Sequence, residues 1–241
     1  MATTVCDILE AAGLTVLRPN TAAYTARNQS YWSVSARINP TCIVQPRSTE
    51  QVAQAITILK TQTTCKWAVR GGGHASYPGA SNISDGVTLD LGLMNQTEYD
   101  ADGQIAKIGA GGRWHEVYTA LEPFGVTVPG GRASQVGVAG FLLGGGNSFF
   151  SSMVGLGCDS VINFEVVLAS GQVVNANREV NADLHKALKG GSGNFGVVTR
   201  FDVQAFPIGD LWGGQVVYPL TTTEQHIAAY VDWVDNIRSY P

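Results

Sequence analysis

The stretch KWAVRGGGHASYPGAS, residues 66–81, decides how the rest of the chain is interpreted. A short apolar run ends at Arg70, three consecutive glycines follow at 71–73, and a titratable side chain, His74, comes next. Glycine reaches backbone conformations that are closed to other residues, and it lets other groups approach the main chain closely. We therefore expect a strand that ends in a glycine loop, and this loop presents the histidine.

The residues before this loop predict a strand–helix–strand unit. TCIVQP (41–46) is a short strand-like run that ends at a proline, and STEQVAQAITILKTQ (48–62) has apolar residues at helical spacing. Ser48 followed three residues later by Gln51 is a helix-capping pattern. Together with the run that ends at Arg70, these segments predict a small parallel βαβ unit that ends at the glycine triplet.

The remaining patterns predict a mixture of strands and helices. The expected strands lie at 87–94, 105–112 and 196–207, with turn residues between the first two at 100–103 and a hairpin at 160–177 around Ser170-Gly171. The expected helices lie at 7–17, 113–125 and 181–191, while 20–40 is predicted to be loop and 126–146 fits neither period. Residues 212–220 and 221–241 predict a strand and a helix that begin an incomplete second domain.

Composition narrows the possible partners. The 241 residues carry a net charge of −4, and only 14% of them are charged, against about 25% in typical soluble domains. Nucleic-acid binding needs clustered Lys and Arg, so we expect no nucleic-acid partner. No apolar run approaches the roughly 18 residues that span a bilayer, so we expect no membrane partner.

Cysteines and glycosylation sequons bear on the cellular compartment. The four cysteines show no Cys-x-x-Cys spacing, which argues against a metal site and favours a disulfide or buried thiols. Asn28, Asn82 and Asn95 begin Asn-x-Ser/Thr sequons and are predicted glycosylation sites. The first residues lack the basic and long apolar parts of a signal peptide. A secreted protein whose leader has been removed fits these features, and a cytosolic protein is the open alternative.

Glycine clusters at 71–73, 130–146 and 190–196 are typical of several kinds of binding site. GSGNFG (191–196) matches a dinucleotide fingerprint, but a predicted helix precedes it and a predicted strand follows, which reverses the required order. No Gly-Lys-Ser or Gly-Lys-Thr follows any cluster, which excludes a phosphate P-loop. The clusters are therefore either turns of a glycine-rich β protein or concave nests of N–H groups that bind a pyrophosphate.

Five segments in order resemble a known family: residues 69–95, 109–118, 128–150, 158–174 and 188–203. They resemble the PCMH-type FAD-binding domain of the vanillyl-alcohol-oxidase superfamily, and most closely the fungal oxidases of the berberine-bridge-enzyme type. The resemblance implies an α+β fold in which two α+β subdomains enclose FAD. It also implies an N-terminal segment at 1–31, the FAD-binding domain at 32–207 and the start of a truncated substrate domain at 208–241.

The resemblance further implies which residues contact the cofactor. In the family the histidine of the glycine loop is bonded to the 8α-methyl carbon of the flavin, and the matching residue is His74. The implied FAD contacts are Arg70, Gly71, Gly72, Gly73, His74, Ser76, Pro129, Gly130, Ser134, Val136, Gly137, Gly140, Gly145, Gly146, Asp159, Val161, Gly196 and Val198. Relatives also pair an N-terminal cysteine with one just before the histidine loop, which implies a disulfide between Cys6 and Cys65.

The chain departs from the family pattern at three positions. The usual loop is Arg-Ser-Gly-Gly-His-Ser, and Gly71 and Ala75 replace its two serines, so two hydroxyl donors are absent. Some relatives attach the flavin a second time through the cysteine of Cys-x-x-Val-Gly-x-Gly-Gly, where this chain has Ala133. We therefore expect a single attachment, through His74, and interpret Cys158 as a packing residue.

The function that the resemblance implies is an FAD-dependent oxidoreductase acting on CH–OH or CH–CH groups. The expected substrate is a small molecule (an alcohol, a sugar or a secondary metabolite), with molecular oxygen as the acceptor. No catalytic base is assigned, because His115, Tyr218, His226 and Tyr230 sit in ordinary helix or strand patterns. The alternative is a non-catalytic flavin-binding fragment or interaction protein that lacks the substrate domain.

Overall fold

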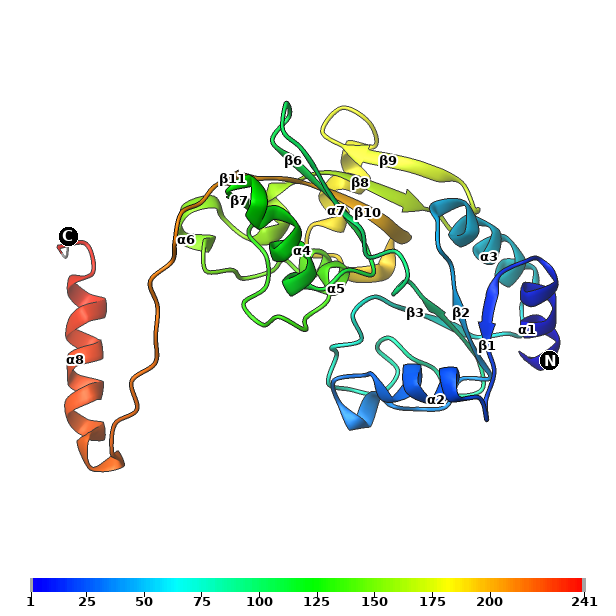
Figure 1. The fold of residues 1–241 in the computed structure, drawn as a ribbon, viewed down its shortest axis with the longest axis horizontal. Helices are drawn as coiled ribbons and strands as arrows, with labels where there is room; N and C mark the ends of the chain where they lie inside the picture. The colour runs from blue at the N-terminus through cyan, green and yellow to red at the C-terminus, as the bar shows by residue number, and fades with distance from the viewer. Residues whose placement is uncertain (1, 240–241) are drawn as a thin grey trace. The chain divides into compact units, whose positions relative to one another are not determined.

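The computed structural model describes residues 2–239, which form two compact units, Met1–Ile208 and Gly209–Pro241. The first unit contains a four-stranded sheet, a five-stranded sheet and a small two-stranded sheet (Figure 1). The predicted α+β class is confirmed. Residues 2–31 belong to the same compact unit as the predicted FAD-binding domain, and the strand within them pairs with its first sheet.

The four-stranded sheet carries the glycine loop at one end. Its strand order is β1–β2–β4–β3, with β1 at Thr15–Leu17, β2 at Cys42–Gln45, β4 at Val87–Asp90 and β3 at Trp67–Arg70. The strands β2, β4 and β3 are parallel, and β1 is antiparallel to β2. Every residue of β2 and β4 is buried, as expected for parallel strands that are covered on both faces.

The predicted βαβ unit is present with one difference. Helix α3 (Thr49–Thr61) joins the parallel strands β2 and β3, and the Ser48 hydroxyl accepts a hydrogen bond from the Gln51 N–H, so the predicted cap is confirmed. However, β4 lies between β2 and β3 and pairs with both. The sequence pattern of three neighbouring segments cannot show that a later strand inserts between them.

The N-terminal predictions are wrong in detail. Helix α1 spans Ala2–Ala11, and residues 15–17 form β1 instead of continuing the helix. The segment predicted to be loop contains α2 (Ala22–Gln29), because the Thr21 hydroxyl caps the N–H of Tyr24. Figure 1 shows α1 and α3 together on one side of the first sheet, with α2 on the other.

The disulfide predicted between Cys6 and Cys65 is also wrong. Cys6 is bonded to Cys42, and Cys65 and Cys158 are buried free thiols. Helix α1 packs against β2, which brings Cys6 over the first residue of that strand. Cys65 precedes β3, and β4 separates β3 from β2. Strand order, which the sequence pattern could not provide, therefore decides the pairing.

The five-stranded sheet is antiparallel, in the order β5–β6–β10–β8–β9. Its strands are β5 (Thr97–Asp100), β6 (Ile105–Gly109), β8 (Val161–Val167), β9 (Val173–Asn177) and β10 (Val197–Gln204). The predicted hairpin around Ser170-Gly171 is confirmed as the β8–β9 pair. The small sheet pairs β7 (Val126–Thr127) with β11 (Phe206–Pro207).

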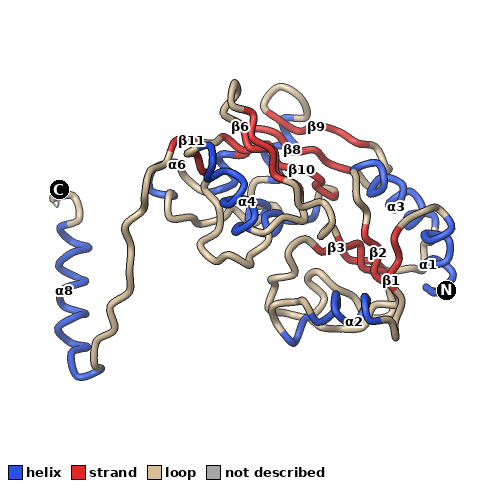
Figure 2. Tube along the Cα trace, in the orientation of Figure 1, coloured by secondary structure: helices blue, strands red, loops and turns tan. Residues whose placement is uncertain are grey.

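Short helices and loops complete the first unit, and Figure 2 shows the loops in tan. The helices are α4 (Trp114–Leu121), α5 (Val138–Leu143), α6 (Ser151–Val154) and α7 (Ala182–Leu188). The 3-10 turns are η1 (Val34–Ala36), η2 (Glu122–Phe124), η3 (Gly157–Ser160) and η4 (Ser192–Asn194). Because α7 precedes GSGNFG and β10 follows it, the observed order also contradicts a dinucleotide fold.

The second unit consists of an extended segment, the turn η5 (Leu220–Thr222) and helix α8 (Thr223–Asn236). The predicted helix is confirmed over α8, and residues 240 and 241 of that prediction lie outside the described residues. The strand predicted at 212–220 is wrong, because a strand needs a hydrogen-bonded neighbour and the described part of this unit contains no other extended segment. Between residues 2 and 239, no helix combines the length and apolar character needed to cross a membrane.

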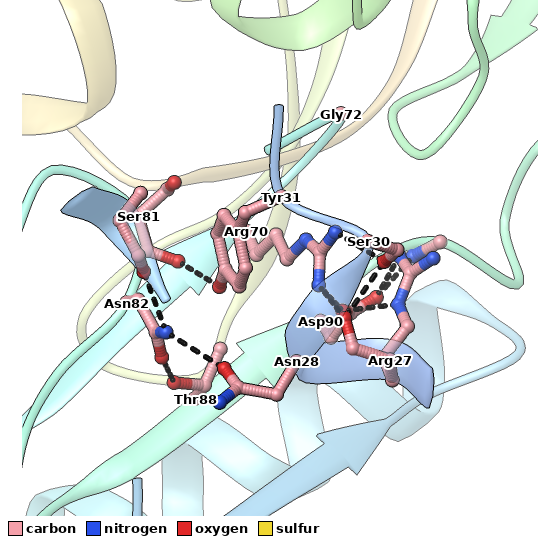
Figure 3. Close-up of polar contacts among 12 residues, drawn as sticks. Arg27, Asn28, Ser30, Tyr31, Arg70, Gly72, Ser81, Asn82, Thr88 and Asp90 are labelled. Atoms are coloured by element: carbon pink, nitrogen blue, oxygen red, sulfur yellow. Dashed lines mark hydrogen bonds and ion pairs between the residues drawn. The ribbon is translucent and has the colours of Figure 1, made fainter. Parts of the chain in front are cut away.

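Two predicted glycosylation sites are also corrected. Asn82 is buried, and its side-chain N–H groups donate to Asn28 and to the backbone carbonyls of Ala36 and Ile38 (Figure 3). Asn28 is buried as well. A glycan replaces a hydrogen on this amide nitrogen and needs solvent around it, so neither residue fits an acceptor. Asn95 is exposed and remains a predicted site.

Candidate functional site

The first unit contains a cavity of about 670 Å³. Two stretches of backbone line it: residues 71–75 after β3, which we call the first wall, and residues 136–140 at the start of α5, which we call the second wall. The lining continues along β3 as far as Trp67, which adds about 13 Å of strand length. Lys, Arg, Asp and Glu are absent from the described residues that line this cavity.

The two walls touch through glycines. A Cβ atom added to Gly72 would lie 2.4 Å from the Cα of Gly137, and one added to Gly137 would lie 2.5 Å from the Cα of Gly72. These separations are far below any normal contact between carbon atoms. The chain therefore has glycine at both positions because two main chains meet there without room for side chains.

Unpaired N–H groups are the main polar feature of the walls. None of the N–H groups of residues 71–75 donates a hydrogen bond to another described residue, although Gly72 and Gly73 are buried. In the second wall the N–H groups of Ala139 and Gly140, at the start of α5, have no acceptor in the described chain either. Buried N–H groups are normally paired, so these groups suit a ligand with anionic oxygens.

A cluster of charged side chains supports the first wall from behind. Asp90, fully buried at the end of β4, accepts two hydrogen bonds of 2.6 Å from Arg27 and lies 3.4 Å from the guanidinium of Arg70 (Figure 3). Arg70 also donates to the carbonyl of Arg27 and the hydroxyl of Ser30, and it stacks over the ring of Tyr31 at 3.7 Å. The cluster joins α2, β3 and β4 directly beneath the loop.

This cluster corrects the role of Arg70. The resemblance implied that Arg70 contacts FAD, but its side chain is fully buried and does not line the cavity. Its guanidinium fills the space beside Gly73, whose φ is +67° and where an added Cβ would lie 2.6 Å from Arg70 Nε. Arg70 therefore holds the loop in a conformation that favours glycine.

The charges behind the first wall are predominantly positive. Burial lowers the pKa of Arg70, and the nearby Asp90 acts in the opposite direction. Burial also acts to lower the pKa of Arg27, but the hydrogen bonds and charge of Asp90 outweigh it, so the pKa of Arg27 is raised. Two guanidinium groups thus share one carboxylate, and the excess positive charge favours an anion on the other side of the loop.

Apolar packing supports the second wall. The indole of Trp114, fully buried in α4, packs edge-on against Phe141 of α5 at 5.1 Å. Gly130 and Gly131 lie against the same indole, where added Cβ atoms would approach ring atoms within 2.2 and 2.5 Å. Burial raises the pKa of Tyr118, whose hydroxyl donates to the carbonyl of Gly131.

His74 lies at the end of the first wall and lines the cavity. Its ring stacks on Trp32, with centroids 4.7 Å apart and planes 17° apart. The backbone N–H of Trp32 also donates to the carbonyl of Gly73. Trp32 therefore contacts the loop with both its main chain and its side chain, and the sequence analysis did not identify this role.

The structure brings half of the implied FAD contacts to this cavity. The residues that line it are Gly71, Gly72, Gly73, His74, Val136, Gly137, Gly140, Gly196 and Val198. The others besides Arg70 do not line it and remain predictions: Ser76, Pro129, Gly130, Ser134, Gly145, Gly146, Asp159 and Val161. Asp159 and Val161 instead line a second hollow of about 680 Å³.

These features fit FAD. The elongated cavity has the apolar lining that a flavin or adenine ring needs, and the unpaired N–H groups of both walls suit a diphosphate without any Lys or Arg in contact with it. The glycines that touch between the walls allow the ligand to approach the main chain itself. Residues 71–75 and 136–140 would therefore hold the diphosphate.

Comparison with known proteins agrees with this fit. A family described as "FAD binding domain" matches residues 40–177. FAD-dependent monooxygenases of Emericella nidulans and Aspergillus calidoustus are 45% and 44% identical to this chain over 92% and 90% of its residues. These matches cover 47% and 42% of the relatives, so the chain spans about half the length of the curated relatives it matches.

Solved structures show the same architecture. BBE-like 1 of Physcomitrella patens is 31% identical, with a TM-score of 0.75, over 86% of this chain and 45% of that one. A carbohydrate oxidase of Microdochium nivale is 32% identical, with a TM-score of 0.78, over 86% and 44%. The chain belongs to the FAD-binding domain family of PCMH type, and within it to the berberine-bridge-enzyme-like group.

Proposed function

We propose that the protein is an oxidase whose FAD is attached once, through His74, and which oxidises an alcohol, a sugar or a secondary metabolite at a CH–OH or CH–CH group. The observation that carries this proposal is the position of His74, which lines the cavity directly after a run of glycines with unpaired N–H groups. Bound FAD supplies hydride acceptance, and molecular oxygen takes up the two electrons and two protons as hydrogen peroxide.

One relative supports attachment through a histidine, and two features of this chain argue against a second bond to the flavin. The glucooligosaccharide oxidase of Acremonium strictum, 29% identical to this chain, carries a 6-S-cysteinyl, 8α-N1-histidyl FAD. The family motif places Ala133 where a second tether would need a thiol. The free thiols of Cys65 and Cys158 are buried and do not line the cavity. Tyr77 also lines the cavity, but His74 is the lining residue at the position of the family's attachment histidine, so the proposal assigns the bond to His74.

The chain's own groups have separable tasks in this proposal. The N–H groups of residues 71–75 and of Ala139 and Gly140 bind the diphosphate, while Val136, Phe141 and Leu143 exclude water from the rings. Gly71 and Ala75 provide no hydroxyl, so backbone N–H groups carry the polar contacts of the first wall. No catalytic base is assigned among the described residues.

The names of the curated relatives favour a second candidate. Two relatives at 45% and 44% identity are called FAD-dependent monooxygenases, whereas three structural neighbours are called oxidases. A monooxygenase transfers one atom of molecular oxygen to its substrate and reduces the other atom to water. The two electrons for this come from an external donor or from the substrate itself. An oxidase releases one peroxide for each substrate molecule oxidised. Labelled oxygen in the product identifies the first activity, and peroxide in a one-to-one ratio with product identifies the second.

The attachment is tested by mass analysis of the peptide that contains His74. After loading with FAD and acid precipitation, we expect a yellow pellet and a flavin adduct on that peptide alone. His74→Ala should give a colourless pellet and should still bind FAD reversibly. An adduct in the His74→Ala protein, or its absence from wild type, would refute the attachment. A flavin-bound full-length protein that oxidises no alcohol, sugar or secondary metabolite would instead indicate a non-catalytic flavin-binding protein.

We also propose that the protein is secreted. The Cys6–Cys42 disulfide and the exposed sequon at Asn95 support an oxidising compartment. Expression of the full-length protein in a fungal host tests this. Enrichment in the medium with a glycosidase-sensitive mass at Asn95 is expected, and retention of unglycosylated protein in the cytosol would contradict the proposal.

A further inference from the structure

The side chain of Arg113 joins the two walls of the cavity. One guanidinium nitrogen, Nη2, donates to the carbonyl of Gly72 at 2.9 Å, and the other, Nη1, donates to the carbonyl of Gln135. The backbone around Arg113 is itself paired with the second wall, because the N–H of Trp114 donates to the carbonyl of Val136. Arg113 therefore reaches from the second wall to the first.

We propose that Arg113 is a positioning residue, which sets the orientation of the glycine-loop peptides for the diphosphate of FAD without touching the diphosphate. Its side chain is absent from the cavity lining, so its hydrogen bonds go to protein carbonyls. This inference rests on FAD binding alone. It holds whether or not His74 becomes attached to the flavin.

The geometry of the peptide bond explains how Arg113 acts. In a trans peptide the C=O and the next N–H point in opposite directions, and residues 2–239 contain no cis peptide. The carbonyl of Gly72 is held by Arg113, so the N–H of Gly73 points away from Arg113. Gly73 is buried, and this N–H has no acceptor in the described chain. The Gly73 N–H is therefore oriented to donate a hydrogen bond to a ligand oxygen.

Two neighbouring peptides are held in a similar way. The N–H of Leu91 donates to the carbonyl of Arg70, and the N–H of Trp32 donates to the carbonyl of Gly73. The N–H groups of Gly71 and His74 therefore point away from these donors. Both donors are backbone groups, whereas the carbonyl of Gly72 depends on a side chain. A substitution of Arg113 therefore removes the hydrogen bond that fixes the orientation of the peptide between Gly72 and Gly73.

An arginine suits this position better than a lysine. The planar guanidinium presents two parallel N–H groups and can hold two carbonyls at once, while an ammonium is a compact point charge on a flexible stem. The position of the side chain is fixed at its base, because the N–H of Arg113 donates to the carboxylate of Glu116 at 2.9 Å. Arg113→Lys therefore keeps the charge and removes the two-carbonyl contact.

The test uses apo-protein with His74→Ala, in which binding stays reversible, titrated with FAD, ADP and riboflavin. We expect Arg113→Lys to raise the Kd of FAD and of ADP by at least about tenfold, equivalent to about 1.4 kcal/mol. The Kd of riboflavin, which has no diphosphate, should change less than about twofold, or about 0.4 kcal/mol. The control is Arg132→Ala. Arg132 is an exposed arginine of the glycine-rich segment 130–146, and its guanidinium lies over the ring of Phe149.

Each outcome bears on the proposal. Selective weakening of FAD and ADP by Arg113→Lys, with Arg132→Ala close to the parent, supports it. Three other results overturn it: unchanged affinities in Arg113→Lys, equal weakening of all three ligands, or equal weakening of FAD by Arg132→Ala. Equal weakening of all ligands would assign Arg113 to the general stability of the fold. Equal weakening of FAD by Arg132→Ala would show that the loss does not depend on the hydrogen bond to the Gly72 carbonyl, which Arg113 makes and Arg132 does not.

Discussion

The two walls of the cavity present similar backbone to the ligand and rest on different supports. The first wall rests on Arg27, Arg70 and Asp90, a buried cluster whose members are held by charge and hydrogen bonds. The second wall rests on Trp114 and Phe141, which are held by apolar packing. We infer that the first wall is sensitive to loss of charge and the second to loss of volume, and substitutions can test this difference.

The largest effect is expected where the walls meet. Gly72→Ala places a Cβ 2.4 Å from the Cα of Gly137, and main-chain atoms cannot move aside without shifting a whole loop. We expect the free energy of unfolding to fall by about 3 kcal/mol, at the upper end for overpacking. FAD affinity should fall at least about tenfold, since 1.4 kcal/mol corresponds to this factor. Equilibrium denaturation of apo-protein and titration with FAD measure the two effects.

Gly140→Ala is the matched control for stability. A Cβ at Gly140 meets no atom within 4 Å, and this glycine has no positive φ. Replacement of glycine by alanine in a helix should leave the free energy of unfolding unchanged or raise it slightly. If both variants lose the same stability, the contact between the walls is not the cause.

The next effect should appear in the first wall alone. Asp90→Asn removes the carboxylate that faces Arg27 and Arg70 while keeping the side-chain volume. Arg70 is fully buried, so its charge is left uncompensated, and losing one partner of a buried ion pair typically costs about 3–5 kcal/mol. We expect a decrease of about 3 kcal/mol in the free energy of unfolding, which equilibrium denaturation of apo-protein measures.

An exposed ion pair provides the control for this variant. Asp7 pairs with Arg18 at 2.6 Å, but its side chain is 64% exposed, so Asp7→Asn should change stability by less than about 1 kcal/mol. Comparable losses in the two variants would mean that burial of the Asp90 cluster does not determine its contribution.

The first wall could be predicted from the sequence, but the cluster of Arg27, Arg70 and Asp90 that supports it could not. Residues 66–74 carry a local pattern, a β-rich run followed by Gly71–Gly73 and His74, and the structure has β3 and the cavity loop there. The partner of Arg27, in contrast, is Asp90, 63 residues away, and it depends on the insertion of β4 between β2 and β3. Local patterns carry no information about such pairings.

The same reasoning explains the other differences. Cys6 pairs with Cys42 rather than Cys65 because strand order determines which cysteine α1 covers. Arg113 lies within a segment that resembles the family, but the sequence predicts no role for it, because its hydrogen bonds go to carbonyl groups of residues 41 and 22 positions away. An arginine directly after Gly111 and Gly112 is the one sequence feature that could have drawn attention to it.

A smaller effect is expected from a conservative change in the second wall. Trp114→Phe leaves a small void against Gly131, but it also removes an indole N–H that has no hydrogen-bond partner in the described chain. The two changes oppose each other, because removing an unsatisfied buried donor relieves a penalty of about 1–3 kcal/mol. We expect a net loss of about 1 kcal/mol, against about 3–5 kcal/mol for Trp114→Ala. Denaturant unfolding of both variants, compared with Asp90→Asn, tests whether volume governs this wall.

The smallest effect concerns the outer support of the second wall. The turn η3 is hydrogen-bonded to Gly145 and Gly146 just after α5, and β8 begins where η3 ends. His185 of α7 is buried against Phe164 and donates from Nε2 to the carbonyl of Val161, the first residue of β8. Burial lowers the pKa of His185 in the folded protein, and the charges of Lys189 and Arg178 act in the same direction.

The lowered pKa fixes the sign of the pH dependence. In the unfolded chain this histidine has a pKa of about 6.5, so it binds a proton at a higher pH than it does in the folded protein. The contribution of neutral His185 to the free energy of unfolding is therefore fully present above this pH and is lost as the pH falls below it. His185→Gln can keep a donor toward Val161 without titrating, so its stability should decline less between pH 7 and pH 5. The comparison uses His115→Gln, at an exposed position on α4, as the control. If the stability of His185→Gln declines with pH as steeply as that of the parent, protonation of His185 does not weaken the outer support of the second wall, and apolar volume is its main source of stability.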